Sequence, residues 1–229
     1  MDFQDYSQLW SQIPGYAAMK NAQGIYLTCN NNLAVLMGLK FPSQIQGLSD
    51  FELLDYSEEN YSFHHKNDVL ALKGKTVRCI HRSSSPYDGS YYYLIKKPLM
   101  NKENEITGIL YHCMPLIQSN FIKQLIAYDV KNNCPNQKPY EYYIDAVDNP
   151  FQLSHRELEC LFFTLRSMTA KQIAEQLDLS KRTVEFYLEN IKNKMGCTSK
   201  AELICLAINR GYLRYIPSHF LSKKDFNLI

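Results

Sequence analysis

The strongest hydrophobic periodicity of the chain lies between residues 153 and 212. Two runs of apolar side chains recur there at helical spacing, and Asp178, Leu179 and Ser180 form the connection between the two helices that they predict. The first run is Ile173, Ala174 and Leu177, and the second is Val184, Leu188, Ile191 and Met195. The pattern therefore predicts a short helix, a tight turn and a longer helix that buries one face and leaves the other polar.

Helix start signals divide the same stretch into four helices. A Ser or Thr precedes each helical pattern, and in three cases a Glu or Gln follows three positions later, which is the spacing of a capping box. The pairs are Ser154 with Glu157, Thr169 with Gln172, and Ser199 with Glu202, while Ser180 has no such partner. Four short helices with brief connections predict a compact all-α domain over residues 151–213.

Residues 21–117, in the first half of the chain, combine short apolar runs typical of strands with two helical segments, so they predict an α+β domain. Apolar and aromatic runs predict strands at 25–29, 76–82, 90–99 and 106–114. Asp88 and Gly89 mark a hairpin turn between the second and third of these strands. Helices are expected after Asn30 or Asn31 and again around 63–73. Residues 1–20 are expected to form a lead-in helix that Pro14 and Gly15 break.

Two further segments flank the predicted helical domain. Residues 118–150 carry a short amphipathic helix, an Asn- and Pro-rich stretch and an aromatic run from Tyr140 to Ile144, so they are expected to link the two domains. Residues 214–229 form a tail whose apolar side chains predict packing against another surface. These side chains are Tyr215, Ile216, Phe220 and Phe226.

Composition and charge exclude several classes of protein for this chain. The 229 residues are 45% hydrophobic with a formal net charge of +2, so the chain as a whole is not a basic nucleic-acid coat. Between Lys181 and Lys200, however, five basic residues stand against two acidic ones. The first residues lack the basic and apolar regions of a signal peptide, and no apolar stretch is long enough to span a membrane. A cytoplasmic protein without a membrane partner is expected, with its seven scattered cysteines as reduced thiols.

Enzyme motifs are missing from the sequence. It has no phosphate-binding loop, no Gly-x-Ser-x-Gly, no HExxH and no cluster with the spacing of metal ligands. The strand order also lacks the regular strand–helix alternation of a phosphorylated receiver domain. A non-enzymatic role is therefore expected.

Residues 153–212 resemble, without a gap, the LuxR-type (FixJ/NarL-type) DNA-binding domain. The matching motifs are Leu153-Ser154-x-Arg156-Glu157, Lys171-x-Ile173-Ala174-x-x-Leu177, Ser180-x-x-Thr183-Val184 and Ile191-x-x-Lys194-Met195-Gly196. The resemblance implies four helices, of which the third reads the DNA major groove and the fourth often forms a dimer surface. It implies a reading face of Arg182, Glu185, Phe186 and Glu189, flanked by Lys171, Lys181, Thr183, Tyr187, Lys192 and Lys194.

Three departures from the family pattern bear on this site. Glu185 and Glu189 stand where the family commonly has Lys, and Tyr187 stands where a His is common. A common Gly is also replaced around residues 166–168. A carboxylate can accept a hydrogen bond from cytosine N4, but it repels phosphate. Base reading by the two glutamates and simple ion pairing with nearby lysines are both open at this point.

Residues 21–117 resemble a PAS sensor domain in the order of their elements. The resemblance rests on residues 20–26 through Asn30, on Gly47-x-x-Asp50-Phe51, on Gly74, and on Lys97-Pro98-Leu99 through Gly108-Ile109. It implies a pocket for a small molecule, haem or flavin, or a core filled by side chains. Cys29-Asn30 does not reproduce the flavin motif, and His64 and His65 fit a solvated helix start better than a haem ligand. Haem and flavin are therefore not expected, and a small-molecule ligand is left open.

The two resemblances together imply a bacterial DNA-binding transcription regulator. It would bind double-stranded DNA as a homodimer, and its PAS-like domain would sense a signal or mediate dimerisation. Two alternatives stay open. One is an interaction adaptor with weakened DNA binding, and the other is a regulator whose N-terminal half is an autoinducer-binding domain of the quorum-sensing kind.

Overall fold

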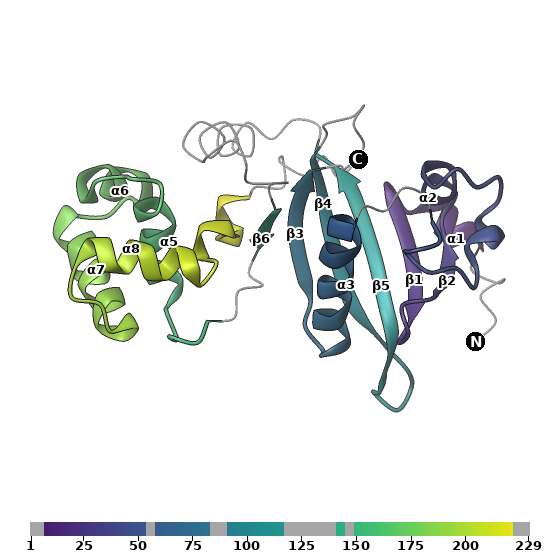
Figure 1. The fold of residues 1–229 in the computed structure, drawn as a ribbon. Coiled ribbons are helices and arrows are strands. Elements are labelled where there is room, and N and C mark those ends of the chain that lie inside the picture. Colours follow the sequence, from purple (N-terminus) through teal and green to yellow (C-terminus); the bar gives the residue numbers. More distant parts are fainter. Residues whose placement is uncertain (1–6, 54–57, 83–90, 117–140, 145–148, 222–229) are drawn as a thin grey trace. The chain divides into compact units, whose positions relative to one another are not determined.

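The computed structural model describes residues 7–53, 58–82, 91–116, 141–144 and 149–221. These residues form two compact units, a sheet with helices in the first half of the chain and a helical domain in the second (Figure 1). The expected fold class, an antiparallel α+β domain followed by a four-helix domain, is confirmed.

The first unit is built on antiparallel strands in the order β2-β1-β5-β4-β3. They are β1 (Tyr16–Asn21), β2 (Tyr26–Cys29), β3 (Val77–Arg82), β4 (Tyr91–Met100) and β5 (Ile106–Pro115). Buried residues oppose one another along the ladders, as Leu94 does with Cys79 on one side and Cys113 on the other. The four strands expected from the sequence are therefore confirmed to within one residue at each end.

Strand β1 takes the place of the end of the expected lead-in helix. The described part of that helix, α1, covers only Ser7–Gln12, and the strand begins directly after Gly15. Because β1 pairs with β2 on one side and β5 on the other, Ala17 and Ala18 are buried. Alanine favours helices in isolation, and pairing on both edges overrides that preference. The expected boundary at residue 21 thus falls on the last residue of a strand.

Three helical elements follow β2 in the first unit. Helix α2 (Asn31–Leu36) begins after Asn30, whose side chain accepts a hydrogen bond from the backbone N–H of Leu33 at 3.0 Å. A short 3-10 helix, η2 (Pro42–Ile45), comes next. Helix α3 (Glu58–Leu72) lies against β3, β4 and β5 (Figure 1). The sequence implies one strand, short helices, a long helix and three antiparallel strands, and the structure has this PAS-like order with the additional strand β1 in front.

The described part of the second unit contains four α-helices. They are α5 (His155–Thr164), α6 (Ala170–Leu177), α7 (Lys181–Met195) and α8 (Lys200–Asn209) (Figure 1). The main packing contacts join α5 with α7 and α6 with α7, so α7 lies against both preceding helices. Residues 170–195 are therefore a short helix, a tight turn and a longer helix, as the periodicity predicts.

The four helices begin at the residues that the start signals predict. Complete capping boxes form at Ser154 and Thr169. Ser180 accepts a hydrogen bond from the backbone N–H of Thr183. At Ser199 the side chain accepts from the Glu202 N–H, and the Glu202 carboxylate accepts from the Thr198 N–H at 2.8 Å.

The connections of the helical unit use residues with left-handed backbone. Ser167 has φ 62° between α5 and α6, at the place where the resembling family commonly has glycine. Asp178 has φ 53° in the turn between α6 and α7. A short polar side chain tolerates this conformation better than a bulky one, although glycine adopts it with least strain. The sharp turn before α7 therefore rests on an aspartate.

The second unit continues past the four helices. After α8 come η3 (Tyr212–Arg214), strand β7 (Tyr215–Ile216) and η4 (Ser218–Phe220). Strand β6 (Glu141–Ile144), which precedes the helices, pairs with β7 in parallel, with Tyr143 opposite Tyr215 and Ile144 opposite Ile216. Tyr215 and Ile216 are buried, so the expected packing of this part of the tail is confirmed.

Other predicted features lie outside the described residues. These are the Asp88–Gly89 turn, the amphipathic helix and Pro-rich stretch of the linker, Cys134, and Phe226. Of the aromatic run that starts at Tyr140, the structure describes β6.

Candidate functional site

Helix α7 buries one face and exposes the opposite one. Val184, Ile191 and Met195 are buried, as expected from their spacing. Since each residue turns the helix by about 100°, the opposite face can be read from the sequence. It carries Arg182, Phe186, Glu189 and Asn193, all of them exposed. Phe186 keeps 61% of its surface accessible, so the face combines polar groups with one open aromatic ring.

Both glutamates of α7 are paired with lysines of the same helix. Glu185 Oε1 lies 3.3 Å from Lys181 Nζ, and Glu189 Oε2 lies 2.7 Å from Lys192 Nζ. Exposed pairs at these spacings add only about 0.3–0.5 kcal/mol to stability. Their larger effect is on the surface charge, because each pair cancels one positive and one negative group. Of the two possibilities that the sequence left open, ion pairing of the glutamates with nearby lysines is present in the structure.

Two predicted cations at this surface have no ion-pair partner among the residues that the structure describes. Arg182 lies in the first turn of α7, and Lys171 lies in the first turn of α6. Both side chains are exposed. The hydroxyl of Thr183, in contrast, is 2.8 Å from Ser180 Oγ and takes part in the cap of α7. Arg182 and Lys171 are therefore the predicted cations most open to an anionic ligand.

Lys194 is engaged within the fold. Its Nζ donates to Glu157 Oε2 at 2.7 Å and to the carbonyl of Gln152 at 3.2 Å. Glu157 is the capping-box carboxylate of α5, and its side chain is almost fully buried. Burial alone would raise the pKa of Glu157, but hydrogen bonds from Lys194 and from Ser154 bring that pKa below its ordinary value. The ammonium group expected near phosphate thus ties the end of α7 to the start of α5.

Two side chains complete the description of α7. Tyr187 is half-buried, with its ring centroid 6.1 Å from that of Phe186. Asn193 is exposed and was missed by the sequence reasoning. It lies seven positions after Phe186, so helical spacing places it on the same face and could have identified it.

The geometry of α6 and α7 suits the DNA major groove. A short helix, a tight turn and an exposed second helix form the helix-turn-helix arrangement, in which the second helix enters the groove. Its exposed face offers a guanidinium, an amide and a phenyl ring. These groups can contact guanine, adenine and the thymine methyl group, respectively.

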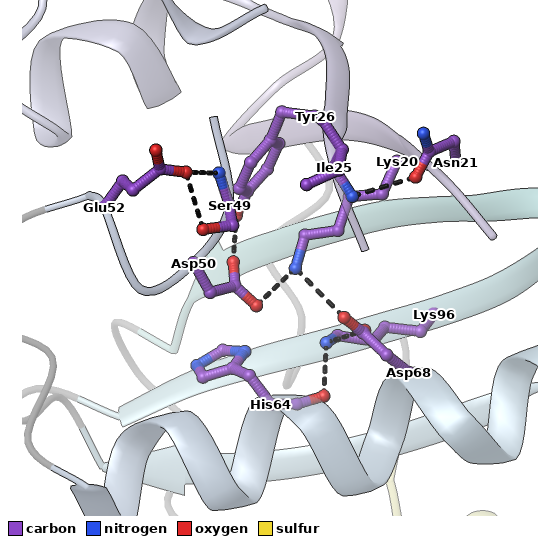
Figure 2. Close-up of polar contacts among 10 residues, drawn as sticks. All are labelled: Lys20, Asn21, Ile25, Tyr26, Ser49, Asp50, Glu52, His64, Asp68 and Lys96. Atoms are coloured by element: carbon purple, nitrogen blue, oxygen red, sulfur yellow. Dashed lines mark hydrogen bonds and ion pairs between the residues drawn. The ribbon is translucent and has the colours of Figure 1, made fainter. Parts of the chain in front are cut away.

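The first unit contains a buried charge network that the sequence reasoning did not find (Figure 2). Lys20 Nζ lies 2.5 Å from Asp50 Oδ2 and 3.0 Å from Asp68 Oδ2. Lys96 pairs with the other oxygen of Asp68 and donates to the backbone carbonyl of His64 at 3.0 Å. All four charged side chains are more than 90% buried. Two lysines and two aspartates make the network neutral, so it joins β1, α3 and β4 without a net charge.

The network shifts the pKa values of its members. Burial would raise the pKa of Asp68, but attraction to Lys96 and Lys20 and hydrogen bonds from both bring it below its ordinary value. Burial lowers the pKa of Lys96, and Asp68 opposes that shift. Tyr26 also donates to Asp50 Oδ1 at 2.8 Å. A buried charge is stable only when it is paired in this way, so loss of one partner would leave an uncompensated charge.

His64 does not match the expected solvated helix start. It is partly buried, with its ring centroid 5.1 Å from Phe63 and 5.7 Å from His81. Burial, followed by repulsion from Lys96, His81 and Lys20, brings the pKa of His64 well below its ordinary value of 6.5. His65 is exposed and stacks on Tyr61. The two neighbouring histidines thus have different environments.

The cysteines of the described residues are free thiols. Burial raises the pKa of Cys29 to about 11 and the pKa values of Cys113 and Cys160 to about 12. Thiols with such pKa values are poor nucleophiles at neutral pH. The expectation of small core residues is therefore confirmed for these three positions.

The four-helix unit matches a known protein family. Residues 152–207, from just before α5 to within α8, match the model of the bacterial regulatory proteins of the luxR family. The C-terminal domain belongs to the LuxR family. The match begins after β6 and ends before η3 and β7, so both strands of the pair β6–β7 lie outside the matched residues.

The chain is also similar in sequence to individual transcriptional activators. The transcriptional activator VanR of Vibrio anguillarum is 32% identical over 95 residues, which are 42% of this chain and 37% of VanR. The transcriptional activator LuxR of Aliivibrio fischeri is 25% identical over 175 residues, 69% of this chain and 64% of LuxR. The alignments thus cover less than two thirds of each relative's length.

Among solved structures, the VqmA dimer of Vibrio cholerae, a LuxR-type receptor, is similar along most of its length. It is 24% identical, with 95% of this chain and 92% of VqmA covered at a TM-score of 0.49.

Among the helices that the structure describes, none has the length and apolar character needed to cross a membrane.

Proposed function

We propose that the chain is a bacterial DNA-binding transcription regulator that acts in the cytoplasm. The LuxR-family domain binds double-stranded DNA through the exposed face of α7. The observation that carries this proposal is the arrangement of that helix, with Val184 and Ile191 fully buried on one side and Arg182 and Phe186 open on the other. Transcriptional activators such as VanR and LuxR carry a similar domain.

The DNA contacts that we propose follow the geometry of the individual side chains. Arg182, Phe186, Glu189 and Asn193 face the bases, and Lys171 lies where the preceding helix passes the backbone. Lys181, Thr183, Glu185, Tyr187 and Lys192 flank this face. Lys194 contributes through the fold, since its ammonium group is bound to Glu157.

The oligomer that fits this function is a homodimer. Helix-turn-helix proteins read two half-sites about one helical turn of DNA apart, and this requires two copies of the reading helix. Ile208 on α8 is 45% exposed, although it is a large apolar residue. An apolar side chain on the outer surface of a small domain is compatible with contact to a second copy.

The PAS-like unit takes the role of signal input in this proposal. Its buried network joins β1, α3 and β4 through four charged side chains. Such a network permits few alternative arrangements, because any displacement separates buried charges. A small molecule that binds one arrangement better than another would shift the population toward it. Dimerisation without a ligand is the second role that this unit can fill.

Binding of the full-length chain to labelled genomic DNA fragments at modest salt tests the function. The chain is expected to shift some fragments, and Arg182→Ala should weaken this binding at least about tenfold, since a bidentate arginine contact is worth about 1–3 kcal/mol. Lys102→Ala is the matched control, because it removes one exposed positive charge from the other unit. A chain that shifts no fragment would instead support an interaction adaptor.

A further inference from the structure

The exposed ring of Phe186 is the unusual feature of the α7 surface. It is 61% accessible, in a helix where Val184, Ile191 and Met195 are buried and Leu188 is partly buried. Its described ring contact is with Tyr187 at 6.1 Å between centroids, on the helix itself. Phe186 therefore adds nothing to the core, and an open phenyl ring on a groove-facing helix points to an apolar contact in the complex.

The charged side chains of α7 nearest to Phe186 in sequence are largely neutralised by ion pairs. Glu185, its neighbour in sequence, is paired with Lys181, and Glu189 is paired with Lys192. Arg182 lies four positions before Phe186, so the two side chains are neighbours on the helix surface. Among the residues that the structure describes, Arg182 has no ion-pair partner, so the centre of the reading face is a guanidinium beside a phenyl ring, between ion pairs that are internally neutral.

The major groove offers one apolar group to such a ring. Base edges display hydrogen-bond donors and acceptors, and the only apolar feature is the C5-methyl group of thymine. A phenyl ring gains nothing from a donor or acceptor, and burial of a polar edge without a partner is unfavourable. The position and chemistry of Phe186 therefore select bases that carry a methyl group.

We infer that Phe186 is a specificity-determining residue that packs against the 5-methyl group of thymine in each operator half-site. The inference rests on the proposed DNA binding and names the chemical group that the site reads. Burial of one methyl group is worth about 0.8 kcal/mol, or about fourfold in affinity, and two half-sites give about 15-fold. Arg182 then reads a polar edge of an adjacent base pair.

The test compares thymine with uracil, which differs only in the missing methyl group. Operators are first selected by the full-length chain from a duplex library with a randomised centre. The best site is then made with thymine or with deoxyuridine throughout, and both duplexes are titrated with the wild-type chain, with Phe186→Ala and with Phe51→Ala. Phe51 is an exposed phenylalanine of the first unit, 78% accessible, and serves as the matched control.

The expected result is coupling between the ring and the methyl group. Deoxyuridine should weaken binding of the wild-type chain and of Phe51→Ala about 15-fold, and should leave binding of Phe186→Ala nearly unchanged. If the loss is equal in all three proteins, or absent in the wild type, the assignment of Phe186 is wrong while DNA binding stands. If no site is selected at all, the proposed function itself is wrong. Thermal melting of Phe186→Ala should match the wild type, because the ring is outside the core.

Discussion

The Nζ atom of Lys194, in the last turn of α7, lies 2.7 Å from Oε2 of Glu157, the carboxylate that caps α5. The same carboxylate accepts from the Ser154 backbone N–H at 2.6 Å. One buried oxygen thus receives donors from two helices. The orientation of the reading helix in the domain depends in part on this shared acceptor.

Replacement of this lysine should lower stability as well as any DNA affinity. For Lys194→Met we expect a loss of about 1 kcal/mol in the free energy of unfolding of the C-terminal domain, because a charged hydrogen bond to a buried group is lost from a partly exposed lysine. Lys192→Met is the matched control, since it breaks a surface pair worth about 0–0.5 kcal/mol. Urea titration followed by circular dichroism measures both, and equal losses would contradict the structural role.

We expect the two ion-paired glutamates to limit non-specific DNA binding. Replacement of Glu185 and Glu189 together by Gln removes two negative charges and releases Lys181 and Lys192 for phosphate contacts. Affinity for DNA of unrelated sequence should rise, and its dependence on salt should steepen by about one to two ions per chain. Fluorescence anisotropy at several salt concentrations measures both effects.

The control for this charge change lies in the other unit. Glu103→Gln removes one exposed negative charge from the turn between β4 and β5 and should leave the salt dependence unchanged. A double variant with unchanged affinity would show that the paired lysines never reach phosphate. Loss of binding to a selected operator, with unrelated DNA unaffected, would show instead that the glutamates read bases.

The buried network of the first unit should be sensitive to the loss of a single charge. Lys96→Met leaves two buried aspartates with one lysine, and we expect a destabilisation of about 3–5 kcal/mol. The added substitution Asp68→Asn restores neutrality around the remaining pair of Lys20 and Asp50, so the double variant should lose less than the single one. Lys97→Met, at the exposed neighbouring position, is the control. Urea unfolding detects the difference, and an additive double variant would argue against coupling.

The stability of the first unit should fall below neutral pH because of His64. Its folded pKa lies well below the ordinary 6.5, so between these two values the unfolded chain binds a proton that the folded chain does not. The free energy of unfolding then decreases as the pH falls from about 6.5, by at most about 1.4 kcal/mol per pH unit. His64→Asn should flatten this slope, whereas His65→Asn, at an exposed position, should not. Urea unfolding at several pH values decides between them.

The left-handed residue between α5 and α6 offers a stabilising substitution. Ser167 has φ 62°, a conformation that costs an L-residue about 1 kcal/mol and glycine almost nothing. Ser167→Gly should therefore raise the melting temperature of the C-terminal domain by a few degrees. Ser154→Gly, at an N-cap with extended backbone, should lower it slightly and serves as the opposite case. A lower melting temperature for Ser167→Gly would show that strain at this turn is negligible.

The sequence predicts the helical domain well because its information is local. Caps such as Ser154 and Thr169 act within one turn of helix, and the buried row of α7 follows from the helical repeat alone. Local spacing also predicts the ion pairs of Glu185 and Glu189. The contact of Lys194 with Glu157 was missed because it joins residues far apart in the chain, and no periodicity connects them.

The first unit is harder to predict for the same reason. β1 contains two alanines and becomes a strand only through pairing with β2 and β5. The four residues of the charge network come from separate elements, and each resembles an ordinary surface residue in the sequence. Their burial depends on the whole fold, so only the structure shows that Lys20 and Lys96 share Asp68.

The pairing of β6 with β7 has a kinetic consequence. Its two strands are separated in the sequence by the entire four-helix domain. A contact between such distant residues closes a large loop, so it is slow to form and gains favourable energy only after the helices have packed. Weakening it, as in Ile216→Ala, should accelerate unfolding and leave the refolding rate almost unchanged. The short strand pair therefore prolongs the lifetime of the folded domain rather than guiding the domain to its fold.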